Sequence, residues 1–339
     1  MNGAPLLSVV ITAWRPRPYL RDALNSVRVQ SDSMNPFETI LVVNPLSPAN
    51  EPGLPLDGVR IIECTESGVG AFIAAGVEAS RGEIIAFLDD DDFWLPGRLR
   101  RVTQIMANCD RVGYYHNQQI AVDSSSTLTS FPFFRTWRFW RTQSSPIELG
   151  KDASVRLLSR VGRFLPYFNN SSIAVRRSIL LSHIDGLKRL RRNEDEFVFY
   201  AALASRHAVF LDSARLTAYR VHGQNISTGV GGLDEPRLRK AYEFTSQSIE
   251  AQSIIRDLIC GCGREDLMPL VSRELAFASV LNAVQSDDYD RKRIARRCLS
   301  LAKHIQVFDA GANSVALGVA TASLLFPSAI QQLYARVRT

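Results

Sequence analysis

The stretch AFLDDDDFWLPGRL, residues 86–99, places four consecutive aspartates directly after an apolar run. Two unit charges about 4 Å apart repel by roughly 1 kcal/mol in water and by about 4 kcal/mol at a partly buried site. The cluster is therefore costly beside a core, and a divalent cation would remove that cost. Hard oxygen ligands on a turn suit Mg²⁺ or Mn²⁺, which also bind substrate phosphates. The simpler interpretation, an aspartate cap for a helix that begins near Pro96, needs fewer than four carboxylates.

Apolar runs and amphipathic segments alternate through the residues that precede these aspartates. This alternation predicts an α/β fold, in which parallel strands are joined by helices that cover both faces of the sheet. The predicted strands are residues 6–12, 39–44, 59–64 and 83–88, and the predicted helices are residues 19–31 and 68–80. The aspartates thus follow a strand at its carboxyl end, the edge where open α/β sheets bind ligands. We expect the loops after Thr12 and Asn44 to reach the same cleft.

The second half of the chain changes in character near residue 230. A helix that begins near Pro96 and strands at residues 112–122, 171–177 and 207–221 are predicted before that point, and the last of these could also be a bent pair. Residues 124–165 are irregular and predict a long functional loop or flap. Long helical patterns follow from Glu235. We therefore expect a catalytic domain over residues 1–230 and a helical region over residues 231–339, which could serve membrane-surface or oligomer contact.

Composition narrows the class of protein. The 339 residues include 40 basic and 34 acidic side chains, for a net charge of +6. Basic patches at residues 135–141, 188–192 and 291–297 favour binding of polyanions, although each could be only a solvated face.

The five cysteines lack paired spacing, so neither a disulfide framework nor a zinc site is predicted, and we expect a reducing, cytoplasmic setting. The apolar segment at residues 315–326 is short for a membrane span and could pack as a core helix or lie on a membrane surface.

Several motifs carry a family resemblance. The segment LDDDDFWLPGRL, residues 88–99, resembles the LDxDDxWxPxxL metal-binding segment of family 2 glycosyltransferases, which use nucleotide-diphosphate sugars. The opening SVVITAWRPRPYLRDALNSVRVQS, residues 8–31, and the RGEIIAFL before the aspartates are similar to that family's own. NEDEF at residues 193–197 and YRVHGQNIS at residues 219–227 resemble its ED motif and its YRxHxxNxS ending. The resemblance implies a GT-A fold, a Rossmann-like mixed sheet with flanking helices.

The resemblance assigns roles to the aspartates. Asp91 matches the aspartate that contacts Mn²⁺ or Mg²⁺, while Asp89 and Asp90 fall where the ribose and the water shell of the metal are held. His222 matches a histidine that can complete the metal-diphosphate site, and a neutral imidazole is a suitable ligand. A histidine flanked by Arg220 is also positioned for phosphate. Taken alone, His222 would be read as a structural loop histidine.

Asp195 matches the catalytic base of the family, with Glu194 beside it. Sugar transfer from a nucleotide diphosphate needs one base for the acceptor hydroxyl. It needs no general acid, in contrast to glycoside hydrolysis, because the metal stabilises the departing diphosphate. The alternative, an acidic N-terminus that stabilises the helix after Asn193, is compatible with this role.

The nucleotide is expected across the loop after the first strand and near Asn44. The candidate donor-binding residues in that loop are Thr12, Ala13, Trp14 and Arg15. The ring of Trp14 could cover the base or pack on the domain edge. Asn44 replaces an aspartate that the family commonly has.

A second departure from the family lies in the helix at residues 68–80. Ile73 and Ala74 stand where the family commonly has arginine and asparagine, so a phosphate-facing cation is missing. Arg15, Arg17 or Arg81 could replace it.

The leading hypothesis is an inverting glycosyltransferase that moves a sugar, with UDP as the favoured nucleotide, to a hydroxyl of a saccharide or lipid-linked saccharide. Polysaccharide or glycan assembly at the inner face of the cell membrane is the expected setting, and an oligomer is left open. The basic aromatic segment at residues 131–141 could serve as a membrane contact, an acceptor platform or a packed flap. The alternative is a catalytically degenerate nucleotide-sugar-binding protein. No nucleic-acid partner is expected, because no nucleic-acid motif accompanies the basic charge.

Overall fold

The computed structural model describes residues 6–15, 17–32, 36–46, 52–107, 109–130, 143–150, 153, 157–158, 161, 166–223, 225, 235–285 and 296–297. The chain forms two compact units. The first comprises residues 1–129, 142–152 and 166–220, and the second comprises residues 130–141, 153–165 and 221–339. The segments at residues 131–141 and 315–326, and most of the basic patch at 291–297, lie outside the described residues.

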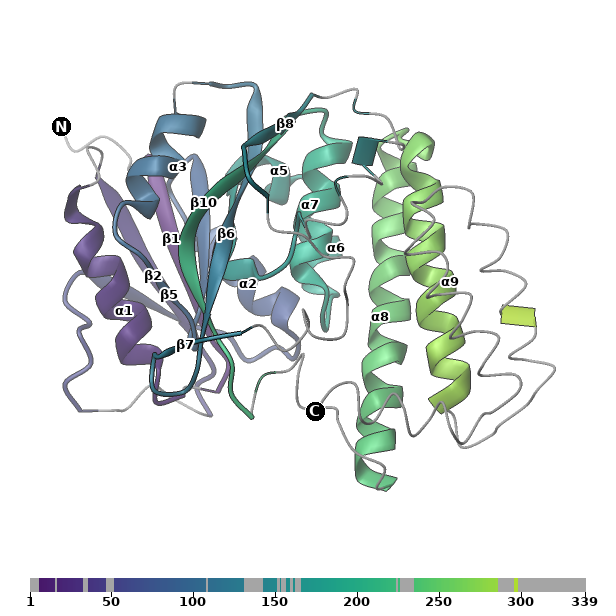
Figure 1. The fold of residues 1–339 in the computed structure, drawn as a ribbon, viewed down its shortest axis with the longest axis horizontal. Coiled ribbons are helices and arrows are strands. Elements are labelled where there is room, and N and C mark those ends of the chain that lie inside the picture. Colours follow the sequence, from purple (N-terminus) through teal and green to yellow (C-terminus); the bar gives the residue numbers. More distant parts are fainter. Residues whose placement is uncertain are drawn as a thin grey trace. The chain divides into compact units, whose positions relative to one another are not determined.

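The first unit is built on one mixed sheet (Figure 1). Its strands run in the order β3-β2-β1-β4-β9-β6-β10-β5, with β7 on β6 and β8 on β10. They are β1 (Leu7–Ala13), β2 (Phe37–Val43), β3 (Val59–Glu63), β4 (Ile84–Asp89), β5 (Phe93–Trp94), β6 (Val112–Val122), β7 (Leu128–Thr129), β8 (Ile147–Leu149), β9 (Ile173–Arg176) and β10 (Ala208–Arg220). The strands β1, β2, β3 and β4 pair in parallel with one another, and β9 is antiparallel to both β4 and β6. The predicted α/β fold with a mixed sheet is thus confirmed.

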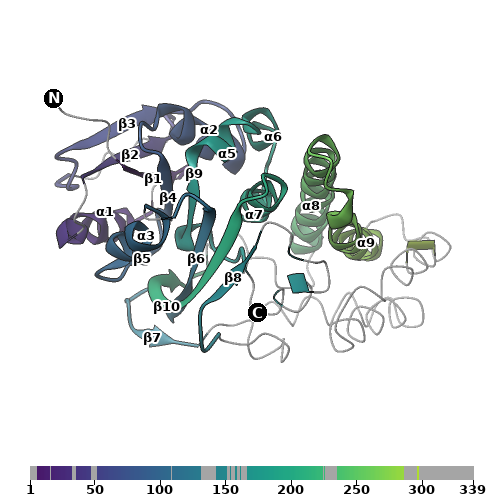
Figure 2. The same cartoon turned by 90° about the horizontal axis from the view of Figure 1, so that it is seen from above.

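Helices cover both faces of this sheet, as Figure 2 shows. The helices α1 (Leu20–Arg28) and α3 (Arg98–Met106) lie on one face, and α2 (Val69–Ala79) lies on the other with α5 (Arg177–Leu181) and α6 (Ile184–Lys188) packed on it. The side chains of β1 alternate accordingly. Val9 shares a buried cluster with Leu24 of α1 and Val102 of α3, while Val10 faces Gly76 of α2. Alternation along a strand therefore places apolar groups on both faces.

The strand predicted at residues 207–221 is one continuous strand, so a bent pair is wrong there. Its pairing with β6 shifts register around Asp212 and Arg215. At the shift Asp212 accepts hydrogen bonds from Arg101 Nε at 2.6 Å and from the Tyr115 hydroxyl at 3.1 Å. The buried Asp212 and Tyr115 are thereby hydrogen-bonded without breaking the strand. The predicted strand at residues 171–177 is shorter in the structure, because the 3-10 helix η3 (Asn170–Ser172) occupies its start.

The described part of the second unit is mainly helical. It contains α8 (Glu235–Gly261), the 3-10 turn η4 (Glu265–Leu267) and α9 (Met268–Gln285), and α8 packs along α9. Asn282 of α9 is buried and donates to Thr245 Oγ1 at 3.1 Å and Ser246 Oγ at 2.8 Å on α8. Among the described residues, no helix combines the length and apolar character that crossing a bilayer requires.

Candidate active site

The four aspartates form a turn between β4 and β5, and we call residues 89–92 the acidic turn. The Asp92 N–H donates to the Asp89 carbonyl at 3.3 Å, which closes the turn. On its far side β5 pairs with β10, and Trp94 Nε1 donates to the Ser171 carbonyl at 2.8 Å. The turn is therefore fixed at both ends to the sheet.

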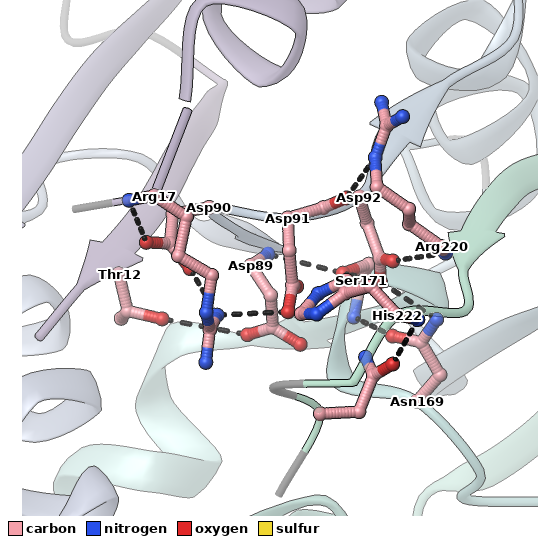
Figure 3. A network of polar contacts seen from close by, with 11 residues as sticks. Thr12, Arg17, Asp89, Asp90, Asp91, Asp92, Asn169, Ser171, Arg220 and His222 are labelled. Atoms are coloured by element: carbon pink, nitrogen blue, oxygen red, sulfur yellow. Dashed lines mark hydrogen bonds and ion pairs between the residues drawn. The ribbon is translucent and has the colours of Figure 1, made fainter. Parts of the chain in front are cut away.

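Asp92 joins this turn to two other segments. Its Oδ2 accepts hydrogen bonds from Asn169 Nδ2 at 2.9 Å and from Ser171 Oγ at 2.7 Å. Its Oδ1 accepts from the Arg220 N–H at 2.9 Å (Figure 3). Asp92 thus acts as the structural anchor of the acidic turn, since both of its oxygens serve protein donors.

Arg17 supplies a cation to the acidic turn. Its Nη1 donates to Asp90 Oδ1 and to Asp91 Oδ2, both at 2.7 Å, as Figure 3 shows. Its backbone N–H lies 3.3 Å from Asp90 Oδ2. Although burial lowers it, the charges of Asp91 and Asp90 raise the pKa of Arg17 overall. Of the three arginines considered as extra cations, Arg17 is the one that contacts the acidic turn.

Burial and mutual repulsion nevertheless make it unfavourable for all of these carboxylates to be ionised at once. Burial, reinforced by the charge of Asp91, raises the pKa of Asp89 to about 7 and the pKa of Asp90 to about 8. The same two causes raise the pKa of Asp92 well above its ordinary value. Carboxylate oxygens of Asp89, Asp91 and Asp92 lie within 4.8 Å of one another. An all-oxygen donor set with excess negative charge fits a hard divalent cation.

The loops after β1 and β2 lie beside the acidic turn. Thr12 is in register with Asp89, and its Oγ1 lies 3.4 Å from Asp89 Oδ1. Ala13 is in register with Val43, so Asn44 comes at the same sheet edge, where its Oδ1 accepts from the Leu46 N–H at 2.9 Å. The three strand ends therefore meet as expected.

Trp14 and Arg15 continue from this edge into the loop after β1. Trp14 is 44% exposed, and the Arg15 guanidinium stacks on its ring at 4.6 Å. An exposed ring at the sheet edge is available for stacking, so its assignment to the base stays a prediction.

The helix α7 (Glu194–Ala204) begins with Glu194 and Asp195. Asn193, at a left-handed φ of 58°, precedes it, and Asp195 Oδ1 accepts from the Glu196 N–H at 2.8 Å. Burial and the charge of Glu194 raise the pKa of Asp195 well above its ordinary value, and Asp89 adds to that effect. Because these carboxylates act on one another, the first turn of α7 and the acidic turn belong to one electrostatic site.

His222 follows β10 by two residues and belongs to the second unit. Its N–H donates to Asn225 Oδ1 at 2.6 Å. Its role as a metal ligand stays a prediction.

Arg220, which flanks His222 in the sequence, bonds to other residues of the protein. It is fully buried, and its Nη2 donates to Asp22 at 2.8 Å while its Nη1 donates to Ser126 Oγ at 2.9 Å. Its Nε donates to the Asp91 carbonyl at 2.9 Å, and its guanidinium stacks on Tyr19. Arg220 therefore stabilises the acidic turn through its hydrogen bonds to Asp91 and Asp92.

Sequence reasoning missed the polar turn at η3. Its signal was the run NNSS, residues 169–172, placed directly before an apolar strand. Asn169 adopts a left-handed φ of 71°, which is strained for a residue other than glycine. Asn170 is 2% exposed, and a hydrogen-bonding interaction of its side chain with Asp89 opposes the rise in the pKa of that carboxylate. A strained, buried polar turn beside four aspartates points to function.

Comparison with known proteins confirms the family resemblance. Residues 8–151 match the family model described as glycosyl transferase family 2. An uncharacterized glycosyltransferase of Nostoc sp. is 25% identical over 255 residues, which cover 72% of this chain and 74% of that protein. The chain is thus similar to known glycosyltransferases over most of its length.

Solved structures confirm the GT-A fold. S. aureus TarS matches with a TM-score of 0.57 at 13% identity over 98% of this chain, which spans only 54% of that TarS chain. TarS 1–349 in complex with UDP-GlcNAc matches with a TM-score of 0.51 at 14% identity, over 92% of each chain. The mannosyltransferase PcManGT of Pyrobaculum calidifontis, in complex with GDP-Man and Mn²⁺, matches with a TM-score of 0.50 at 14% identity, over 96% of this chain and 89% of that one.

Proposed function

From the match of residues 8–151 to the model of glycosyl transferase family 2, we propose that the protein is an inverting glycosyltransferase of that family. It moves a sugar from a nucleotide-diphosphate sugar, with a UDP-sugar as the expected donor, to a hydroxyl of a saccharide or lipid-linked saccharide. Its setting is polysaccharide or glycan assembly in the cytoplasm, at the inner face of the membrane.

One observation carries the proposal. The acidic turn at the carboxyl end of β4 and the Glu194–Asp195 pair at the start of α7 act on one another electrostatically. This nearness supports assigning diphosphate binding to the acidic turn and proton acceptance to the carboxylates of α7. The structural neighbours bound to UDP-GlcNAc and to GDP-Man with Mn²⁺ support a nucleotide-sugar donor.

Asp195 is assigned as the base. Its Oδ1 is fixed by the Glu196 N–H, so we assign the acceptor proton to Oδ2. The acceptor oxygen bonds to the anomeric carbon on the face opposite the diphosphate, and the electron pair of the broken bond leaves with the nucleotide. Burial raises the pKa of Asp195, so its carboxylate has a higher proton affinity than an exposed aspartate. A positioned base contributes about 10²- to 10⁴-fold in rate.

Asp89 and Asp91 are the residues that we expect to hold Mn²⁺ or Mg²⁺, with His222 as a further ligand. When bound, a divalent ion would act as a Lewis acid on the diphosphate leaving group. The hydrogen bonds of Asp92 to Asn169, Ser171 and the Arg220 N–H keep the turn that carries these ligands in place.

The Asp195→Asn variant tests the assignment of the base. The substitution keeps the size of the side chain but removes its proton affinity, so we expect transfer to fall by at least about 10²-fold while the UDP dissociation constant stays unchanged. Product formation and isothermal titration with UDP and Mn²⁺ measure the two quantities. Asp185→Asn on α6 is the matched control, because Asp185 is exposed, and it should retain full activity. Retained turnover in Asp195→Asn would refute the assignment.

The wild-type protein separates this function from its alternative. A thermal-shift screen of nucleotide-diphosphate sugars with Mn²⁺ or Mg²⁺ identifies the donor, since a ligand that binds only the folded state raises stability. Release of the free nucleotide diphosphate with a saccharide acceptor then supports the enzyme. Donor binding without turnover against any acceptor favours the degenerate binding protein.

A further inference from the structure

The guanidinium of Arg17 bonds the acidic turn through one of its three nitrogens. Its Nη1 donates to Asp90 Oδ1 and to Asp91 Oδ2, both at 2.7 Å, so both hydrogens of Nη1 are used (Figure 3). The main chain of Arg17 is held as well, because its N–H donates to Asp90 Oδ2 at 3.3 Å. Arg17 is therefore fixed to the acidic turn by its backbone and by its side chain.

The other two nitrogens of this guanidinium remain available. Among the residues that the structure describes, no hydrogen bond or ion pair engages Nε or Nη2 of Arg17. Neither atom belongs to the buried nitrogens that lack a partner, and 19% of the Arg17 side chain is exposed. A guanidinium carries five N–H groups, so three of them are accessible beside Asp90 and Asp91.

The chemistry of this edge indicates its ligand. The planar fork of a guanidinium binds phosphate or carboxylate oxygens through two parallel hydrogen bonds. In the proposed function, Asp91 holds a divalent cation, and such cations in proteins bind carboxylates together with substrate phosphates. Because Arg17 Nη1 lies 2.7 Å from an oxygen of Asp91, a diphosphate next to that cation comes within reach of the same guanidinium.

The other candidate positions for a phosphate-binding cation are less suitable. Ile73 and Ala74 occupy the two positions of α2 where the family commonly has arginine and asparagine, and both are fully buried in the core. The Arg81 N–H donates to Glu38, near the start of β2. Since β2 and β4 are both parallel to β1, the start of β2 and the acidic turn at the end of β4 lie at opposite edges of the sheet.

We propose that Arg17 binds the diphosphate of the donor through Nε and Nη2, and that it replaces the cation that α2 lacks. The inference rests on the proposed function, because it assumes that a nucleotide diphosphate occupies the site. It gives the charge of Arg17 two opposite effects, since this charge repels a divalent ion and attracts the diphosphate that accompanies the ion. Arg17 is thus a phosphate-binding residue and takes no part in the proton transfer.

The principal test uses Arg17→Gln in the full chain. The probe is whichever of UDP and GDP binds the wild-type protein more tightly, and isothermal titration at saturating Mn²⁺ gives its affinity. Loss of hydrogen bonds between charged groups should lower this affinity at least about tenfold. The affinity for Mn²⁺ alone, measured without nucleotide, should not fall, because the substitution removes a positive charge beside the ion.

Three further variants complete the design. Arg17→Lys keeps the charge but lacks the planar fork, so it should also bind the nucleotide more weakly than the wild-type protein. Arg21→Gln is the matched control, because it removes the same charge from an arginine that bonds the carbonyls of Pro52 and Gly53, and it should leave the nucleotide affinity unchanged. Arg15→Gln tests the remaining candidate, whose guanidinium stacks on Trp14, and its loss should be smaller than that of Arg17→Gln.

Several outcomes would overturn the proposal while the proposed function stands. Wild-type nucleotide affinity in Arg17→Gln or Arg17→Lys would exclude the two-bond contact, and an equal loss in Arg21→Gln or a larger one in Arg15→Gln would place the effect elsewhere. A parallel loss of nucleotide and Mn²⁺ affinity would show that Arg17 only positions the aspartates. If the wild-type protein binds neither UDP nor GDP, the proposed donor class fails and this inference fails with it.

Discussion

Arg17 shares one nitrogen between two carboxylates, so the acidic turn has a cation of its own. The bonds to Asp90 and Asp91 are both 2.7 Å long. A divalent ion that binds Asp91 must therefore compete with the Arg17 guanidinium for the same carboxylate. The positive charge of Arg17 also repels the ion. Arg17 is thus expected to moderate metal affinity.

The Arg17→Gln variant measures this competition. At an effective dielectric constant of about 20, charges about 4 Å apart interact by about 4 kcal/mol, so removing the charge should raise the Mn²⁺ affinity of the nucleotide-free protein at least about tenfold. Isothermal titration with Mn²⁺ reports the affinity. Arg21→Gln is the control, because Arg21 bonds the carbonyls of Pro52 and Gly53. An unchanged or lower affinity in Arg17→Gln would show that Arg17 instead positions the aspartates for the metal.

His116 makes the stability of the fold depend on pH. Its side chain is 4% exposed, and its Nε2 lies 2.8 Å from the Phe168 carbonyl. Burial lowers the pKa of His116 to about 4, whereas an unfolded histidine has a pKa near 6.5. Between these values the unfolded chain binds more protons than the folded one. This contribution to stability is therefore complete above about pH 6.5 and is lost as the pH falls toward 4.

The His116→Gln variant isolates this contribution from that of the aspartates. The difference in unfolding free energy between wild type and variant should shrink as the pH falls from 7 to 5, by at most about 1.4 kcal/mol per pH unit below 6.5. Urea denaturation at several pH values measures it, and the titration of every other group cancels in the difference. A difference that does not change with pH would contradict a buried neutral His116.

At the scale of elements, α2 positions the segment that leads into α7. The Gly70 N–H donates to the Leu190 carbonyl at 3.1 Å. A Cβ on Gly70 would collide with the carbonyl oxygens of Leu187 and Leu190. This close approach fixes the chain between α6 and Asn193, and therefore the place where Asp195 begins its helix.

Gly70→Ala should displace that segment. Overpacking at a rigid contact costs about 1–3 kcal/mol, so we expect a lower Tm and a lower transfer rate, because the proposed base moves with its helix. Gly150→Ala is the matched control, since nothing lies within 4 Å of a Cβ there, and it should change neither quantity. If Gly70→Ala melts and turns over like wild type, the contact does not position α7.

The elements that sequence reasoning predicted are those with long apolar periodicity. The buried strands β1, β2, β4 and β6 and the helices α1 and α2 fall where their patterns predicted them. The strands β5 and β8, of two and three residues, are too short for any period to show. They form because β10 offers them a partner, which no local pattern reveals.

The residues of the candidate site also fall into two groups, those that a local sequence motif reveals and those that only tertiary contacts reveal. Asp89, Asp91 and Asp195 were predicted because their motifs are contiguous in sequence. Arg17 and Asn170 were found only through their distant neighbours, since Arg17 contacts Asp91 across 74 positions. Their importance depends on tertiary contacts that a single sequence does not display.

At the scale of the whole molecule, the bonded network of the site draws on many parts of the first unit. Its hydrogen bonds connect Thr12, Arg17, the acidic turn, η3 and Arg220. The family match also lies largely within this unit. The α8–α9 pair belongs to the second unit. The predicted contact of this helical region with a membrane surface or with another copy of the chain stays a prediction.

The place of β10 between β6 and β5 has a consequence during protein synthesis. Asp92 and Arg220 are separated by 128 positions, so at about 5–20 residues per second the ribosome needs roughly 6–25 s to supply the partner of that aspartate. Until then the nascent chain has neither the strand that holds β5 nor the amide that anchors Asp92, and the edge of β6 that β10 will cover is open to other strands. Translation of β10 is thus the step that covers this edge of β6 and completes the anchoring of the acidic turn.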